Sequence, residues 1–155
     1  MSSRPVPAEQ IHGTVVALGG MGVVFRGSPG AGKSDLALRL MDGGAQLVAD
    51  DRVDVTVRRG RAVAFPPPVL AGLIEVRGIG VVRVRHRARA EIRLVVDLVK
   101  PEQVERMPDE KTCLIAGVSL PCLKLAAFEA STPAKVRLAL VHIARRVTKG
   151  GKGKR

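Results

Sequence analysis

The chain has very few aromatic residues. Its 155 residues include three phenylalanines and no tyrosine or tryptophan. A hydrophobic core must therefore be aliphatic, and a chain of this length is long enough to bury one and suggests a single domain. Abundant Val, Leu and Ala together with 17 glycines favour a compact α/β domain.

Cysteines and long apolar runs are also scarce. The two cysteines, Cys113 and Cys122, form no CxxC pair or Cys/His cluster, so they favour buried thiols in a reducing cytosol over a metal site. The N-terminal stretch MSSRPVPAEQ lacks the apolar core of a signal peptide. The longest apolar region, residues 14–25, is interrupted by glycines and is too short to span a membrane. These features predict a cytoplasmic protein with no membrane segment.

Acidic residues are outnumbered by basic ones. The chain has 14 Asp and Glu against 26 Lys and Arg, a net charge of +12, which attracts polyanions or an acidic partner. Three of the positive charges lie in the last six residues, GGKGKR. We expect residues 149–155 to form a disordered basic tail and residues 1–10 to be flexible, which leaves 11–148 as the folded domain.

The segment GSPGAGKS matches the pattern of a phosphate-binding P-loop. The preceding GVVF (22–25) predicts a strand, and apolar residues at helical spacing predict a helix from Lys33 to a stop at Gly43-Gly44. Glycines let backbone N–H groups face phosphate oxygens, and the helix adds its positive N-terminus. Lys33 is expected at the β- and γ-phosphates and Ser34 at Mg²⁺. The predicted nucleotide-binding residues are Gly27, Ser28, Pro29, Gly30, Ala31, Gly32, Lys33 and Ser34.

A second buried strand, within QLVADD, ends in Asp50 and Asp51. A carboxylate at the end of a strand beside a P-loop can hold Mg²⁺ or accept the proton of the phosphoryl acceptor. Neighbouring strand residues point to opposite faces, so one acid could serve the metal and the other the acceptor. The sequence thus predicts a Mg-ATP site and leaves open which acid is the base.

The remaining pattern predicts more strands than helices. GTVVAL (13–18) is typical of a buried strand, RVDVTVRRG (52–60) of a half-exposed strand with a turn at Gly60, and residues 73–99 are mostly strand. Thr132 and Pro133 predict the start of a last helix. Its expected apolar stripe is Val136, Leu140, Ile143 and Val147. We expect one α/β domain that contains the P-loop, with a mixed, strand-rich sheet.

Between residues 83 and 93, arginines occupy alternate positions. Alternation of period two places them on one face of a strand or hairpin. Such a row could dock an acidic surface, grip phosphate, bind nucleic acid or simply face solvent. No aromatic residue lies within it to stack on bases, so nucleic acid is the least expected partner. The row is Arg83, Arg85, Arg87, Arg89 and Arg93.

Four segments in this order resemble the catalytic domain of HPr kinase/phosphorylase: IHG (11–13), GSPGAGKS (27–34), LVADDRVDV (47–55) and LIEVRGIGVVRV (73–84). The resemblance implies a P-loop kinase fold similar to the nucleotide-binding core of phosphoenolpyruvate carboxykinase. It implies ATP-dependent phosphorylation of a serine on HPr, the phosphocarrier of the sugar phosphotransferase system. It also implies the reverse reaction, in which inorganic phosphate attacks phosphoserine and releases pyrophosphate, and a homo-oligomer such as a hexamer.

The resemblance also assigns roles to single residues. Asp51 resembles the proton-transferring acid, and the other implied catalytic residues are Lys33, His12 and Arg106. The implied metal ligands are Ser34, Glu75 and Asp50. The N-terminal domain of longer family members is expected to be absent before the P-loop. The dephosphorylation loop is not recognisable, so the kinase direction has more support than the phosphorylase direction.

Two other functions are compatible with the same motifs. A P-loop kinase for a small metabolite would use the same site. A non-catalytic module could use ATP only to switch its affinity for nucleic acid or a protein, although the acids beside the P-loop speak against that alternative.

Overall fold

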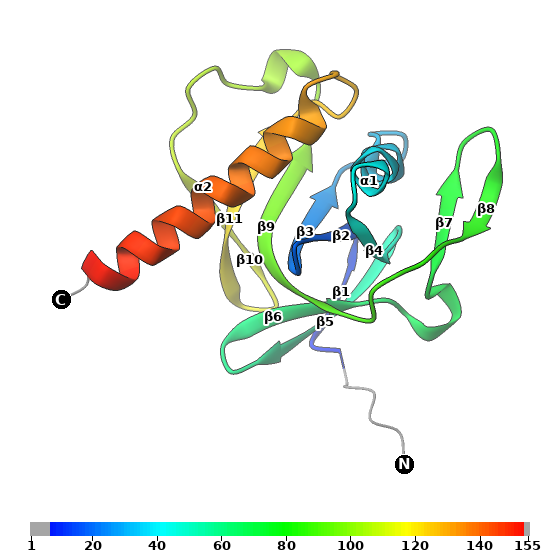
Figure 1. The fold of residues 1–155 in the computed structure, drawn as a ribbon, viewed down its shortest axis with the longest axis horizontal. Helices are drawn as coiled ribbons and strands as arrows, with labels where there is room; N and C mark the ends of the chain where they lie inside the picture. Colours follow the sequence, from blue (N-terminus) through cyan, green and yellow to red (C-terminus); the bar gives the residue numbers. More distant parts are fainter. Residues whose placement is uncertain (1–6, 154–155) are drawn as a thin grey trace.

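The computed structural model describes residues 7–153, with side chains to residue 143. It shows a strand-rich α/β domain with one large sheet, a separate two-stranded hairpin and two helices (Figure 1). Two short 3-10 turns, Pro68–Leu70 and Pro101–Gln103, lie in the connections. The elements are β1 (Glu9–His12), β2 (Thr14–Leu18), β3 (Met21–Arg26), α1 (Lys33–Asp42), β4 (Gln46–Ala49), β5 (Arg52–Arg58), β6 (Arg61–Phe65), β7 (Leu73–Val76), β8 (Gly80–Arg83), β9 (Ala90–Leu98), β10 (Lys111–Ile115), β11 (Val118–Leu125) and α2 (Thr132–Gly153).

The large sheet has nine strands and mixes parallel with antiparallel pairs. Its main order is β1-β5-β6-β9-β3-β2-β4, and β11 joins β9 and carries β10 on its other side. β3 and β11 both run parallel to β9. The strand that enters the P-loop, β3, is therefore flanked by β2 on one side and by β9 on the other. The loop that follows β3 thus has different strands on its two sides.

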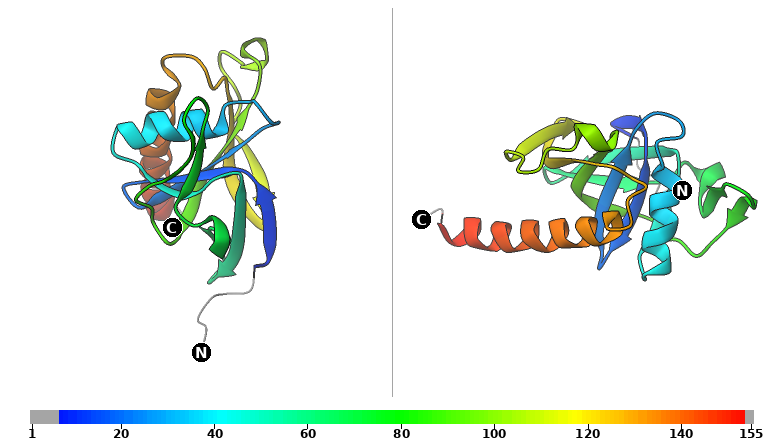
Figure 2. Two further views of the ribbon diagram at one scale, coloured as in Figure 1. Left: turned by 90° about the vertical axis from the view of Figure 1, so that its right-hand side faces the viewer. Right: turned by 90° about the horizontal axis from the view of Figure 1, so that it is seen from above.

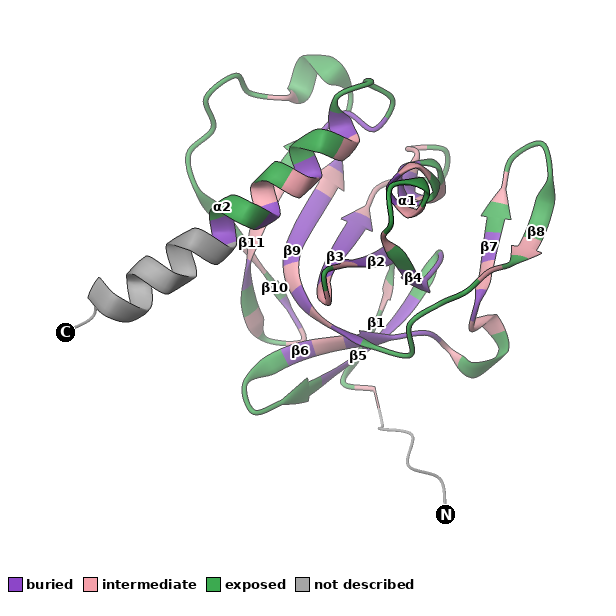
Figure 3. Cartoon of the chain, in the orientation of Figure 1, coloured by how far each residue is buried: buried purple, intermediate pink, exposed green. Residues whose placement is uncertain are grey.

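The sheet has a buried cluster on each face. One face carries Val16, Phe25 and Leu94 and is covered by α1 and α2. The other face is covered by the sheet itself, because β5 and β6 pack their Val53, Val55 and small alanines onto residues of the central strands. The buried colour runs along the central strands and recurs in bands on the described part of α2 (Figure 3). Views from the side and above show α2 lying across the sheet rather than along its edge (Figure 2).

Both predicted helices form where the sequence indicates. α1 begins at Lys33 and ends at Asp42. Its C-cap, Gly43, donates its N–H to the carbonyl of Leu40 at 3.0 Å, and Gly44 has φ +108°. α2 begins at Thr132, and three members of its apolar stripe are buried: Val136, Leu140 and Ile143. Val147 lies outside the residues whose side chains are described.

The arginine row does not lie on one continuous strand. β8 ends at Arg83, residues 84–89 form only an isolated bridge from His86 to Leu47, and β9 begins at Ala90. The alternating pattern is broken because β8 pairs with β7 in its own hairpin, whereas β9 belongs to the large sheet. Arg83, Arg85, Arg87 and Arg89 are nevertheless exposed, while Arg93 is half-buried within β9.

One further expectation needs correction. β5 does not alternate between buried and exposed residues, because Asp54 and Thr56 are buried along with Val53 and Val55, whereas Val57 is exposed. Gln10 of the neighbouring β1 donates to Asp54 at 2.7 Å. β1 already begins at Glu9, and α2 is assigned to Gly153, whereas residues 1–6 and 154–155 lie outside the described part of the chain.

Both cysteines are free and half-buried on neighbouring strands β10 and β11. Within the described residues, no helix combines the length and the hydropathy needed to cross a membrane.

Leu140 and Leu138 of α2 offer a matched test of this packing. Leu140 is 2% exposed in the cluster under the helices, and Leu138 is 69% exposed on the same helix. We expect Leu140→Ala to lower the free energy of unfolding by about 2–5 kcal/mol, because it leaves a cavity, whereas Leu138→Ala changes it little. Urea unfolding followed by circular dichroism measures both. Equal losses in the two variants would contradict the position of α2.

Candidate active site

The P-loop connects the end of β3 to the start of α1. Gly30 and Gly32 have φ of +84° and +103°, a left-handed conformation that glycine adopts without a Cβ clash. Gly32 is the N-cap of α1 and supplies no side-chain cap. The first N–H groups of a helix have no intrahelical acceptor and carry the positive end of the helix dipole. The loop therefore presents free donors and positive potential at one place, which suits a phosphate group.

Close packing also requires glycine in this loop. A Cβ on Gly32 would lie 2.7 Å from the Cβ of Ala127, and one on Gly27 would lie 2.8 Å from the Cβ of Ala31. Both distances are shorter than carbon atoms tolerate. The loop is thus pressed against the segment that follows β11, and its shape is set by tertiary contacts as well as by its own sequence.

Lys33 lies across the loop. Its side chain is mostly buried, and its Nζ donates to the carbonyl of Gly27 at 2.8 Å and to that of Ser28 at 3.3 Å. The loop backbone therefore holds the ammonium group at the mouth of the glycine turn. This is the position from which a lysine can reach a bound phosphate.

Asp50 is the centre of the polar network. Its side chain is 7% exposed and accepts three hydrogen bonds. Oδ1 accepts from the hydroxyl of Ser34 at 2.6 Å and from that of Thr14 at 2.9 Å, and Oδ2 accepts from the N–H of Glu75 at 3.0 Å. The structure therefore brings the side chains of Ser34 and Asp50 together at the start of α1, whereas Glu75 joins them through its backbone and its side chain is exposed.

Thr14 is a site residue that the sequence analysis missed. It is fully buried; its hydroxyl donates to Asp50 and accepts from the N–H of Asp51 at 3.2 Å. One hydroxyl thus fixes both acids. The available signal was a polar residue at the head of the aliphatic run TVVAL, where only a paired hydroxyl is tolerated.

Asp51 has φ +70°, which is uncommon for a residue other than glycine. Its backbone is held at both ends, because its carbonyl accepts from the N–H of Gly13 at 3.1 Å and its N–H donates to Thr14. The side chain is exposed. His12 precedes Gly13, pairs with Arg52 in the β1–β5 register and is also exposed. The predicted His12 and Asp51 therefore lie on adjacent backbone, next to the Asp50 network.

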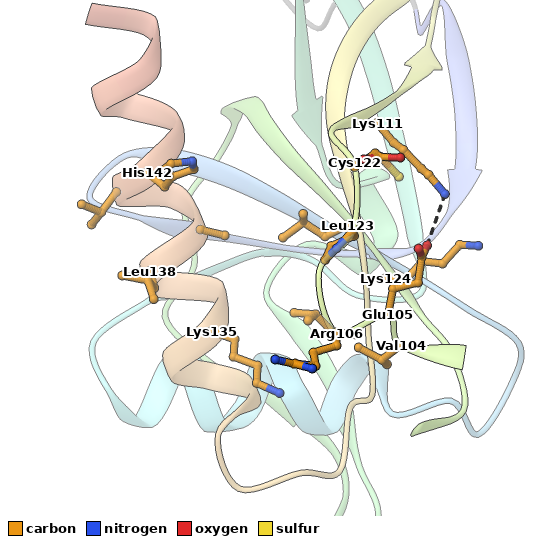
Figure 4. Close-up of a pocket in the computed structure, with 15 residues that line it drawn as sticks. Val104, Glu105, Arg106, Lys111, Cys122, Leu123, Lys124, Lys135, Leu138 and His142 are labelled. Atoms are coloured by element: carbon orange, nitrogen blue, oxygen red, sulfur yellow. Dashed lines mark hydrogen bonds and ion pairs between the residues drawn. The ribbon is translucent and has the colours of Figure 1, made fainter. Parts of the chain in front are cut away.

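Arg106 lies elsewhere. It is exposed in the segment after the 3-10 turn at Pro101–Gln103 and lines a cavity of about 560 Å³ between that segment, β11 and α2 (Figure 4). Leu123, Leu138 and His142 are on the other sides of this cavity. Among the described residues, no hydrogen bond or ion pair joins Arg106 to the P-loop. In the described part of the chain, Arg106 thus makes no hydrogen bond or ion pair with the other predicted site residues.

The donor set at Asp50 fits Mg²⁺. No cluster of three or more His, Cys, Asp or Glu side chains suited to a metal occurs in the described part of the chain. Mg²⁺ does not require one, because it is typically held by one or two protein oxygens together with substrate phosphates and water. The hydroxyl of Ser34 and the carboxylate of Asp50 touch each other beside the P-loop and supply oxygen ligands of that kind.

A second cavity, of about 530 Å³, opens on the other side of the P-loop. Ser28, Gly30 and Ala31 of the loop form one wall, and the ends of β9 and β11 with the segments that follow them form the rest. The cavity is therefore adjacent to the loop that would bind phosphate. Asp50 lies on the other side of the loop, at the end of β4, which pairs with β2.

An ion pair fixes the strand that enters the loop. Arg26, the last residue of β3, donates from Nε to Asp97 of β9 at 2.8 Å, and this hydrogen bond raises the pKa of the guanidinium. Cys122 of β11 donates to the same carboxylate at 3.3 Å. Burial, with help from this hydrogen bond to Asp97, raises the pKa of the Cys122 thiol to about 12, so the thiol stays neutral at physiological pH.

A double-mutant cycle tests the role assigned to Thr14. Thr14→Val keeps the shape but removes the hydroxyl, and we expect it to lower the free energy of unfolding by about 1–3 kcal/mol. Because the loss arises at Asp50, it should shrink in an Asp50→Asn background, with a coupling of about 0.5–3 kcal/mol. Thr56→Val, at a buried threonine of β5 that makes no hydrogen bond with Asp50, is the control and should be additive. Additivity of Thr14→Val with Asp50→Asn in urea unfolding would refute the network.

Comparisons with known proteins point to one family. The family model for the HPr Serine kinase C-terminal domain matches residues 5–150. An HPr kinase/phosphorylase of Chlorobaculum tepidum is 36% identical over 149 residues, which cover 87% of this chain and 42% of that protein. One from Lactobacillus acidophilus is 40% identical over 107 residues, which cover 64% of this chain and 33% of that protein.

A solved structure has the same fold. The Hpr(Ser) kinase/phosphatase from Coxiella burnetii superposes with a TM-score of 0.82 at 25% sequence identity, over 95% of this chain and 99% of that chain. The chain spans less than half the length of the two curated relatives. Since the family match extends over nearly the whole sequence and the fold agrees with it, the chain belongs to the HPr serine kinase C-terminal domain family.

Proposed function

We propose that this domain is a Mg-ATP-dependent protein serine kinase whose acceptor is a serine of the phosphocarrier protein HPr. The observation that carries the proposal is the hydrogen bond between Ser34 of the P-loop and Asp50 at the end of β4. This bond joins the P-loop to the acid that follows β4, two parts of a nucleotide site that are separate in the sequence. The relatives named HPr kinase/phosphorylase support HPr as the acceptor. The proposal includes a P-loop kinase fold similar to the nucleotide-binding core of phosphoenolpyruvate carboxykinase, and a cytoplasmic location, where HPr would be met.

The phosphates of ATP would be bound by the loop from Gly27 to Ser34. Its free N–H groups and the ammonium of Lys33 supply the donors, and the start of α1 adds positive potential. Ser34 and Asp50 would hold Mg²⁺, with Glu75 beside them through its backbone contact to Asp50. When bound, Mg²⁺ neutralises charge on the phosphate oxygens during transfer.

Asp51 is the proposed base for the serine hydroxyl. As the serine oxygen attacks the γ-phosphorus, its proton must leave, and an exposed carboxylate beside the phosphate site can take it. Asp50 is less suited to this task, because its oxygens already accept three hydrogen bonds and it is buried. His12 would assist from the adjacent strand end. Arg106 is left out of this set because it lines the cavity at α2.

Reversal is proposed for the same residues. Protonated Asp51 would return its proton to the serine oxygen when inorganic phosphate attacks phosphoserine, and pyrophosphate would leave. A homo-oligomer, for which a hexamer is our working proposal, would not alter these assignments, because the P-loop, Asp50 and Asp51 come from one chain.

The function is tested with Mg-ATP, HPr and mass spectrometry for phosphoserine. We expect Asp51→Asn to lower the rate by about 10²- to 10⁴-fold, the usual worth of general acid–base catalysis, while ADP binding persists. Lys33→Ala should abolish both transfer and tight ADP binding. Asp42→Asn, at an exposed acid at the end of α1, is the control and should retain activity.

Three outcomes would revise the proposal. Full activity in Asp51→Asn would move the role of base to another group, with Asp50 as the next candidate. Transfer to a nucleoside or sugar in a substrate panel, but not to HPr, would make the domain a small-metabolite kinase. Nucleotide binding without transfer to any acceptor would leave an ATP-switched binding module.

The exposed arginines of residues 84–89 are proposed to attract the protein substrate. This segment runs beside β4, which leads to Asp50, because the N–H of Arg87 donates to the carbonyl of Leu47 at 2.7 Å. We expect replacement of Arg85, Arg87 and Arg89 by Ser to raise KM for HPr and weaken its salt dependence, with ATP binding unchanged. The control removes an equal charge from the β5–β6 turn, at Arg58, Arg59 and Arg61. If both triple variants raise KM equally in steady-state assays, net charge rather than this segment attracts HPr.

A further inference from the structure

Phe128 differs from the other aromatic residues of the chain. Phe25 and Phe65 are buried in the core, whereas Phe128 is 69% exposed in the segment between β11 and α2. An aromatic ring that is left in solvent contributes little to folding. The residues around the ring therefore indicate its role.

The ring of Phe128 adjoins the P-loop itself. A Cβ placed on Gly32 would lie 2.9 Å from Cζ and 3.2 Å from Cε1 of the ring. The edge of the ring is therefore packed against the last glycine of the loop. Most of the ring surface remains open, beside the place where a phosphate chain would lie.

The segment that carries Phe128 is fastened to α1. The guanidinium of Arg39 donates to the carbonyl of Glu129 at 3.2 Å and also to that of Ala127, and its Nε pairs with Asp35 one helical turn away at 3.0 Å. At the other end, the hydroxyl of Thr132 donates to the carbonyl of Ala126. Phe128 is thus held between fixed backbone points, and an aromatic surface held in this way loses little entropy on binding.

The same ring lines the 530 Å³ cavity beside the loop. Leu98, Val99, Pro101 and Ala126 give the cavity an apolar lining. Gln103 and Lys100 supply polar groups, and the Gln103 side chain is oriented by accepting from the N–H of Lys100 at 3.0 Å. A volume in the usual range for small-ligand sites, an apolar lining, one aromatic wall and a few polar groups match the chemistry of a nucleobase.

We propose that this cavity binds the nucleoside half of the nucleotide and that Phe128 stacks on its base. The inference rests on the proposed function, since it requires a nucleotide whose phosphates lie in the P-loop. The strand order supports it, because the cavity adjoins β9 and β11 on one side of β3, whereas Asp50 approaches from β2 and β4 on the other. The two ends of the nucleotide would then be bound on opposite sides of the loop.

Phe128→Trp provides a direct reporter, because the natural chain contains no tryptophan. We expect ADP to change the fluorescence of this single tryptophan, whereas pyrophosphate, which occupies only the phosphate loop, leaves it nearly unchanged. Leu114→Trp, at an exposed position of β10, is the matched control and should respond to neither. Equal responses of Phe128→Trp to ADP and pyrophosphate would show that the ring senses phosphate and not base, which overturns the proposal.

Calorimetry with Phe128→Ala completes the test. Stacking of a base on an aromatic ring predicts a loss of about 5- to 150-fold in ADP affinity. Pyrophosphate affinity should stay unchanged, and so should ADP affinity in Leu114→Ala. If ADP affinity is unaffected by Phe128→Ala while the wild type binds ADP and phosphorylates HPr, the base lies elsewhere and the proposed function stands. If the wild type binds neither ADP nor pyrophosphate, both proposals fail.

Discussion

The buried carboxylate of Asp50 is the interaction on which the candidate site depends. Removing a carboxylate from water is costly unless it receives hydrogen bonds. Here three donors meet it, and they come from the start of α1, from β2 and from β7. These segments are distant in the sequence, so the carboxylate can be satisfied only when the sheet, the P-loop helix and the separate hairpin are all in place. The same contacts that compensate its burial also set the positions of Ser34 and Asp51.

The strand order places complementary chemistry around the P-loop. β3 is central and enters the loop, and its last residue is held to β9 by the Arg26–Asp97 ion pair. On the β2 side lie hydroxyl and carboxylate oxygens, and on the β9 and β11 side lies a mainly apolar cavity. A molecule with a charged end and an apolar end is matched by such an arrangement. This division follows from the strand order, because β3 and the P-loop lie between the strands that carry the oxygen ligands and the strands that line the cavity.

The local part of the site could be predicted from the sequence because it depends on local backbone properties. GSPGAGKS between an apolar strand and an amphipathic helix gives the loop, and Gly43-Gly44 ends the helix. The order of elements predicted an acid beside the P-loop but left open whether Asp50 or Asp51 would face Ser34. Thr14 and Phe128 were not found, since their roles arise from contacts with residues far along the chain. The β10–β11 hairpin was also missed, because its β10 segment KTCLI carries no clear alternation of buried and exposed residues.

Two predictions from periodicity were wrong for a physical reason. Alternation in residues 83–93 describes two strands of different sheets with an irregular crossing between them. Asp54 and Thr56 of β5 are buried between the neighbouring strands β1 and β6, and Asp54 receives a hydrogen bond from Gln10. Alternation in the sequence predicts which side chains share a face of a strand. It does not predict whether neighbouring elements bury that face.

The central claim is that Asp50 and Ser34 together form the metal-dependent half of a nucleotide site. The most direct measurement is the affinity for ADP by calorimetry with and without Mg²⁺, in the wild type and in Asp50→Asn. We expect Mg²⁺ to tighten ADP binding in the wild type and to have little effect in Asp50→Asn, because a neutral amide is a poorer ligand for a hard cation. The same enhancement by Mg²⁺ in both proteins would contradict the central claim.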